Sequence, residues 1–124
     1  MLGTMSQEIQ NDFLNELKGY LPELMELASK LKTSTGSKSE LSELHRLVHT
    51  IRGASSLVKL NTLSSVASEL ESLVEDIINK RQTLKEEVFK AIQTALTYFD
   101  SYSVDDEIQN PQETDKVTIV IACL

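Results

Sequence analysis

The chain has few of the residues that make tight turns. Its 124 residues include only 4 glycines and 2 prolines, whereas an all-β domain of this length needs a turn after every short strand. This scarcity argues against an all-β fold and leaves a fold of helices joined by few loops. The share of hydrophobic residues, 40%, is that of a globular chain, and the length suits one domain with its own core.

Other shortages exclude whole classes of protein. A single cysteine, Cys123, excludes an intramolecular disulfide framework and fits a reducing compartment. The 12 basic residues are outnumbered by 19 acidic ones, and the net charge of −7 disfavours binding to nucleic-acid phosphates. No apolar run is long enough to span a membrane, and the N-terminus lacks the pattern of a signal peptide. We therefore expect a cytoplasmic protein with neither a nucleic-acid nor a membrane partner.

What the chain does contain is a series of apolar stripes with helical spacing. The first runs from Ile9 to Leu31 and keeps its phase across Pro22, which predicts one kinked helix or two helices stacked end to end. Three further stripes follow, over residues 41–58, 63–77 and 84–99. Short polar segments separate the stripes, so the sequence predicts an all-α fold, an antiparallel four-helix bundle over residues 4–103. Asn61 or Thr62 is expected to cap the third helix, and Thr83 the fourth.

The C-terminal residues have a different composition. Residues 104–116 are rich in Asp and Glu and contain Asn110-Pro111, which predicts a solvated acidic linker and so an acidic C-terminal extension of the bundle. Residues 117–124 are β-branched and strand-like, and a helical bundle has no obvious place for them. They are either the start of a following domain or a tail that packs on the bundle, and the sequence leaves both open.

The chemistry of the chain centres on the segment from His49 to Ser55, midway along the second predicted helix. His49 follows the buried position Val48 by one residue, so its ring leaves the helix at the edge of the apolar face. Arg52 lies about one turn further on, beside the ring. A glycine in a helix interior costs about 1 kcal/mol relative to alanine, so Gly53 needs another reason to be there. We expect that its missing side chain leaves the imidazole accessible. A basic neighbour and a bare patch are what a phosphoryl group and an incoming partner need.

Glu71 on the third predicted helix is expected to reach His49. Both residues flank the buried face of their helices, and they are nearly equidistant from the short connection near Asn61. Because a short connection makes the two helices antiparallel, equidistant positions lie at the same height. We expect Glu71 to accept a hydrogen bond from Nδ1 of His49, with Ser68 as a second candidate. This bond would fix the tautomer and leave Nε2 as the nucleophile.

These residues resemble the histidine-containing phosphotransfer (HPt) family, whose helical signature is His, two residues, Lys or Arg, then Gly. The segment His49-Thr50-Ile51-Arg52-Gly53 is most similar to the phosphoacceptor domain of chemotaxis-type histidine kinases, where His-Ser/Thr-Ile-Lys-Gly is usual. The resemblance spans residues 8 to 100, and Glu71 falls where that family has a Glu beside the histidine. Arg52 replaces the commoner Lys and keeps the charge. Lys59 stands where a Gly is usual near the end of the helix, which leaves the form of that turn open.

The resemblance implies a phosphocarrier in two-component or phosphorelay signalling. His49 would accept a phosphoryl group from a kinase domain or a receiver phospho-aspartate, and Arg52 would stabilise the phosphoryl charge. The sequence has no Gly-rich phosphate loop and no Walker lysine, so the donor must supply an energised group. No bound cofactor is expected, and Mg²⁺ would come with the partner. The partner, a receiver domain or a histidine kinase catalytic domain, would dock on a monomeric bundle around His49, at His45, Arg46, Thr50 and Ser56. The chain is either a free-standing carrier or one domain of a histidine kinase.

Simpler interpretations remain open for the same residues. His49 could be a surface histidine without a role, and Arg52 could form only an ion pair with Glu71 or Glu75. His45 and His49 are spaced to share a metal, but the sequence offers only Glu71 as a third ligand, so no metal site is predicted. The alternative function is a helical interaction module that keeps the HPt fold and takes no phosphate, for which Lys59 leaves room.

Overall fold

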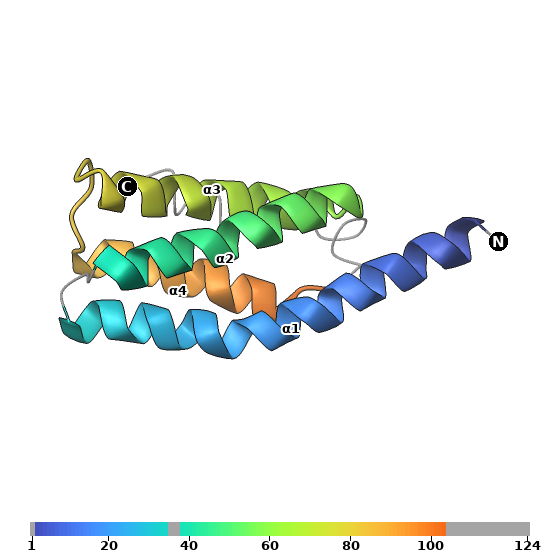
Figure 1. Cartoon of the computed structure of the whole chain (residues 1–124), viewed down its shortest axis with the longest axis horizontal. Helices are drawn as coiled ribbons and strands as arrows, with labels where there is room; N and C mark the ends of the chain where they lie inside the picture. The colour runs from blue at the N-terminus through green and yellow to red at the C-terminus, as the bar shows by residue number, and fades with distance from the viewer. Residues whose placement is uncertain (1, 35–37, 104–124) are drawn as a thin grey trace.

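The computed structural model describes residues 2–34 and 38–103, and all regular structure in this part of the chain is helical. The four helices are α1 (Leu2–Ser34), α2 (Lys38–Leu57), α3 (Asn61–Ile78) and α4 (Glu86–Ser101). Successive helices run in opposite directions, and α2 and α4 each pack against both α1 and α3 (Figure 1). The predicted antiparallel four-helix bundle is confirmed. The expected acidic linker at 104–116 and the strand-like tail at 117–124 lie outside the described residues.

The apolar stripes of the four helices meet in one core. Leu24 of α1, Leu44 of α2, Leu70 of α3 and Phe99 of α4 are among its most deeply buried side chains. Every buried side-chain nitrogen or oxygen atom in the described part of the chain has a hydrogen-bond partner. Within residues 2–34 and 38–103, no helix combines the length and the hydrophobicity that crossing a membrane requires.

Helix α1 continues through Pro22, so the chain forms a single helix rather than two stacked ones. It bends near its middle (Figure 1), as expected where a proline removes a backbone hydrogen bond. Its 33 residues span about 50 Å, roughly twice the length of α4 with its 16 residues. The N-terminal part of α1 therefore extends past the end of α4. Ile9, which the sequence placed in the buried stripe, is 53% exposed for this reason.

Helices α2 and α3 both end in a residue with left-handed backbone geometry. Lys59 has a φ of 64°, and its N–H donates to the carbonyl oxygen of Ser56 at 3.1 Å. The next N–H, that of Leu60, donates to the carbonyl oxygen of Ser55 at 2.9 Å. This is the Schellman helix end, in which glycine is preferred because it has no Cβ to strain. Lys80, with a φ of 60°, ends α3 in the same way. The sequence has Lys59 where a glycine is usual, which left the form of this turn open; the structure shows that the lysine adopts the left-handed geometry itself.

The predicted helix caps are wrong. The N-cap residue of α3 is Leu60, and that of α4 is Lys85; neither side chain bonds a free backbone N–H. Asn61 and Thr62, the two alternatives expected to cap α3, are already its first two residues, and Thr83 lies before the N-cap of α4. The Schellman turn explains the difference at α3, because it carries the fully buried Leu60 into the core directly before the helix begins.

Candidate functional site

His49 lies on the solvent-exposed surface of α2, between the side that faces α1 and the side that faces α3. At about 3.6 residues per turn, His45 and Arg52 lie roughly 40° and 60° around the helix toward α3. Arg46 and Thr50 lie roughly 60° and 100° around it in the other direction, toward α1. The side chain of His49 is 64% exposed. The ring is therefore accessible, with different neighbours on its two sides.

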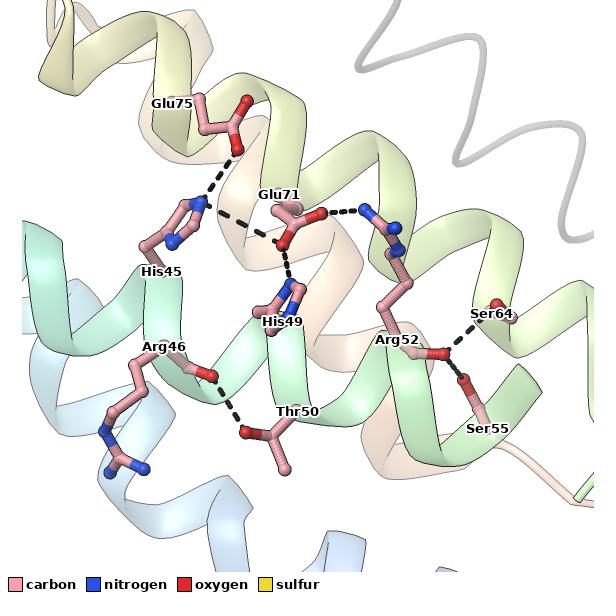
Figure 2. A network of polar contacts seen from close by, with 9 residues as sticks. All are labelled: His45, Arg46, His49, Thr50, Arg52, Ser55, Ser64, Glu71 and Glu75. Atoms are coloured by element: carbon pink, nitrogen blue, oxygen red, sulfur yellow. Dashed lines mark hydrogen bonds and ion pairs between the residues drawn. The ribbon is translucent and has the colours of Figure 1, made fainter. Parts of the chain in front are cut away.

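The side chain of Glu71, on the neighbouring α3, points toward this ring (Figure 2). Its Oε2 lies 2.5 Å from Nδ1 of His49, and its side chain is only 5% exposed. In the neutral tautomer that donates from Nδ1 to this carboxylate, Nε2 is the nitrogen without a proton. The predicted contact between Glu71 and His49 is thus present. Ser68, the second candidate, forms no hydrogen bond with the ring in the described part of the chain.

Arg52 binds the other oxygen of the same carboxylate. One terminal guanidinium nitrogen donates to Oε1 of Glu71, and the Arg52 side chain stays 45% exposed. The ion pair that the sequence offered as a simpler interpretation is therefore formed, but it leaves further N–H donors for a phosphoryl group. The backbone oxygen of Arg52 accepts hydrogen bonds from the hydroxyls of Ser55, at 3.0 Å, and Ser64, at 3.3 Å (Figure 2). The bond from Ser64 ties α3 to α2 beside the site.

Glu71 is a buried charged side chain whose ionised form is stabilised by its neighbours. Burial raises the pKa of Glu71, but hydrogen bonds from His49 and Arg52 and the charge of Arg52 lower it by more. The pKa of Glu71 therefore lies below its ordinary value. The carboxylate is ionised at neutral pH, which is the form that accepts the proton of Nδ1.

Comparison with family models gives a match to most of the bundle. The model described as Hpt domain matches residues 8–102, which include all of α2, α3 and α4. The chain belongs to the Hpt family. Hpt domains transfer phosphoryl groups through a histidine in phosphorelay signalling, and they interact with kinases and receiver domains. No curated protein and no solved structure gives a significant match.

The second histidine of this Hpt domain lies one turn before the first. The rings of His45 and His49 are stacked, with centroids 6.3 Å apart and an interplanar angle of 7°. Nε2 of His45 lies 3.0 Å from Oε1 of Glu75 and 3.9 Å from Oε2 of Glu71. His45, expected among the docking residues, is thus half-buried and turned toward α3. From the sequence, Glu75 was expected only as a possible partner of Arg52. Glu71 and Glu75 are four residues apart, as are His45 and His49, and this equal spacing could have indicated the second pair.

The other expected docking residues lie on the exposed surface of α2. Arg46 forms a hydrogen bond from Nε to Oε1 of Glu43 at 3.1 Å, which lowers the pKa of that carboxyl. The hydroxyl of Thr50 donates to the backbone oxygen of Arg46 at 3.0 Å, and Ser56 is exposed. None of these contacts buries a side chain, so the three residues remain available to a partner.

The surface next to His49 is also bare and partly apolar. Apart from its chain neighbours and the nearby backbone of α2, a Cβ added at Gly53 would meet no heavy atom within 4 Å, so packing against other side chains or helices does not require glycine there. Leu57, one turn after Gly53, is 84% exposed, and with Ile9 of α1 it lines a shallow groove. Leu57 was not among the expected docking residues, although it lies outside the apolar stripe of α2, where an apolar residue indicates an exposed hydrophobic contact.

Proposed function

We propose that His49 is the phosphoacceptor of this Hpt domain and that Nε2 is its nucleophilic atom. The observation that carries the proposal is the 2.5 Å contact between Nδ1 of the exposed ring and the buried carboxylate of Glu71. That contact selects the tautomer with a free electron pair on Nε2 and holds the ring in one orientation. Gly53 adds to it, because the bare helix surface leaves room for a donor to approach.

In the transfer step, the electron pair of Nε2 forms the bond to phosphorus as the bond between phosphorus and the donor oxygen breaks. The donor oxygen leaves with that bond's electron pair, as an aspartate carboxylate from a receiver or as ADP from a kinase. Positive charge develops on the imidazole as the N–P bond forms, and the ionised Glu71 stabilises it. Arg52 contributes its remaining N–H donors to the phosphoryl oxygens, where charge spreads in the transition state.

The proposal needs a donor with its own phosphate chemistry. A histidine kinase catalytic domain or a phosphorylated receiver domain would supply the group together with Mg²⁺. The segment His49-Thr50-Ile51-Arg52-Gly53 favours a kinase of the chemotaxis type. The partner would dock on a monomeric bundle in the cytoplasm, over the exposed side of α2 that carries Arg46, Thr50 and Ser56, with Leu57 as an apolar contact.

The test is transfer of a labelled phosphoryl group to the full chain from phosphorylated receivers and from a chemotaxis-type kinase with ATP and Mg²⁺. His49→Gln removes the proposed acceptor, and His45→Gln is the matched control one turn away on the same helix. We expect an acid-labile, base-stable label on the wild type and on His45→Gln, and none on His49→Gln. A wild type that takes no label from any donor would contradict the proposal and favour the helical interaction module instead.

A further inference from the structure

A second set of ligating atoms lies between α2 and α3, beside the contact of His49 with Glu71. It consists of Nε2 of His45, Oε1 of Glu75 and Oε2 of Glu71 (Figure 2). Ligand atoms of these three residues all lie within 4.8 Å of one another. The proposed phosphoryl transfer uses neither His45 nor Glu75. The cluster therefore needs an explanation of its own.

We propose that His45, Glu71 and Glu75 bind one divalent transition-metal ion of the zinc class. Zinc bonds imidazole nitrogen and carboxylate oxygen at about 2.0–2.2 Å in tetrahedral geometry, which places two ligand atoms roughly 3.4 Å apart. The separations from Nε2 of His45 are 3.0 Å to Glu75 and 3.9 Å to Glu71, on either side of that value. The ion would take the place of the proton between His45 and Glu75, and small side-chain rotations would complete the geometry.

The two helices hold these ligands in place before an ion arrives. Glu71 and Glu75 are four residues apart on α3, so they project from one side of the helix toward α2. Glu71 is buried and bound to Arg52 through Oε1, which leaves Oε2 directed at the histidines. His45 is half-buried, and its ring is stacked on that of His49. Little side-chain freedom is therefore lost when an ion binds.

The chemistry of the donor set favours zinc over magnesium or calcium. Mg²⁺ and Ca²⁺ are bound by oxygen ligands, whereas an imidazole nitrogen suits Zn²⁺ and its transition-metal neighbours. The two carboxylates of Glu71 and Glu75 balance the charge of a divalent ion, while Arg52 on the far oxygen of Glu71 opposes it. Three protein ligands leave one position of a tetrahedral ion for water.

An ion at this site would slow phosphoryl transfer, an effect that rests on the proposed function, whereas the site itself does not. Oε2 of Glu71 would be shared between the ion and Nδ1 of His49. A bound cation draws electron density from that oxygen, so the hydrogen bond to Nδ1 weakens. The positive charge that develops on the ring of His49 would also be less stabilised beside a divalent ion.

The site is tested by calorimetric titration of the full chain with ZnCl₂ in a buffer that does not bind zinc. All proteins carry Cys123→Ser, which removes a thiol that would otherwise compete for the ion. His45→Gln and Glu75→Gln each remove one ligand, and Glu69→Gln is the matched control that removes a carboxylate elsewhere on α3. Thermal melts establish that each variant is folded.

We expect the parent and Glu69→Gln to bind one equivalent of zinc with the same affinity. Binding should be at least about tenfold weaker in His45→Gln and in Glu75→Gln, since each lacks a direct ligand. Two results would overturn the site: no saturable binding to the parent, or equal affinity of the parent and both ligand variants.

The effect on transfer is tested by the rate of His49 phosphorylation in Mg²⁺, without zinc and at a zinc concentration that, by the titration, fills the parent's site and leaves that of Glu75→Gln mostly empty. We expect zinc to slow the parent and to leave Glu75→Gln unchanged, which controls for zinc acting on the donor. Equal slowing of both proteins would overturn the link to transfer. A parent that takes no phosphoryl group in the absence of zinc would contradict the proposed function but leave the titration result standing.

Discussion

At the scale of single residues, Glu71 accepts hydrogen bonds from His49 and Arg52 while almost fully buried. Glu71→Gln should lower the free energy of unfolding at neutral pH by about 1–2 kcal/mol, because a neutral amide cannot replace both charge-assisted bonds. The pKa of Glu71 is lower in the folded than in the unfolded state, so the ionised carboxylate stabilises the fold above the unfolded pKa. This stabilisation is lost as the pH falls through the lower, folded pKa.

The measurement is urea denaturation of the wild type and Glu71→Gln over a series of pH values. The difference between them should be constant near neutrality and shrink below about pH 4.3, where unfolded glutamates become protonated. Glu69→Gln is the control, and it should stay within about 0.5 kcal/mol of the wild type. A difference for Glu71→Gln that does not change with pH would show that the charge of Glu71 is not its source.

Gly53 offers a prediction in which stability and transfer move in opposite directions. Gly53→Ala should raise the free energy of unfolding by about 1 kcal/mol, because alanine is the better helix former and its Cβ meets no side chain or neighbouring helix within 4 Å. The added methyl should nevertheless slow phosphorylation, since it stands where the donor approaches His49. Thermal melts and the initial transfer rate measure the two effects, with Ser65→Ala on the exposed surface of α3 as the control. An unchanged rate in Gly53→Ala would mean that the glycine does not serve access.

At the scale of helices, the left-handed ends of α2 and α3 are places where lysine is strained. Lys59→Gly should raise the free energy of unfolding by about 1 kcal/mol, because the left-handed region disfavours residues with a Cβ. The same substitution in a regular helix should have the opposite sign. Lys90→Gly, in the middle of α4, should lower the stability by about 1 kcal/mol. Denaturation midpoints that move in the same direction for both variants would contradict this account.

The helices α2 and α3, and the contact of His49 with Glu71 between them, could be predicted from the sequence. Their apolar spacing fixed which face is buried, and the short connection fixed the height at which His49 meets Glu71. The same argument would have paired His45 with Glu75, which are also nearly equidistant from the turn. The start of α3 was not predictable in this way, because periodicity does not report the left-handed backbone of Lys59.

At the scale of the whole molecule, α1 closes the bundle by packing on α2 and α4. Leu24→Ala should lower the free energy of unfolding by about 2–5 kcal/mol, because Leu24 is fully buried and leaves a cavity. Met25→Ala is the matched neighbour, and it should lose much less because Met25 is 42% exposed. Urea denaturation followed by circular dichroism measures both. Equal losses for the two variants would contradict the assignment of the core.

The exposure of Ile9 shows what sequence periodicity leaves out at this scale. The apolar spacing of α1 continues to Ile9, and it correctly predicts a helix there. Whether such a residue is covered depends on how far the neighbouring helices extend, and α4 ends before it reaches this part of α1. Burial at helix ends is therefore a property of the assembled bundle.

His45, His49, Arg52, Glu71 and Glu75 all come from two consecutive helices, with only Val58 to Leu60 between them. The entropy lost in closing a loop grows with its length. Contacts between α2 and α3 therefore form with a smaller loss of chain entropy than contacts between α1 and α4. We therefore expect the imidazole and its carboxylate to meet early in folding, ahead of the closure of the bundle. During synthesis, His49 and Glu71 are both translated before α4.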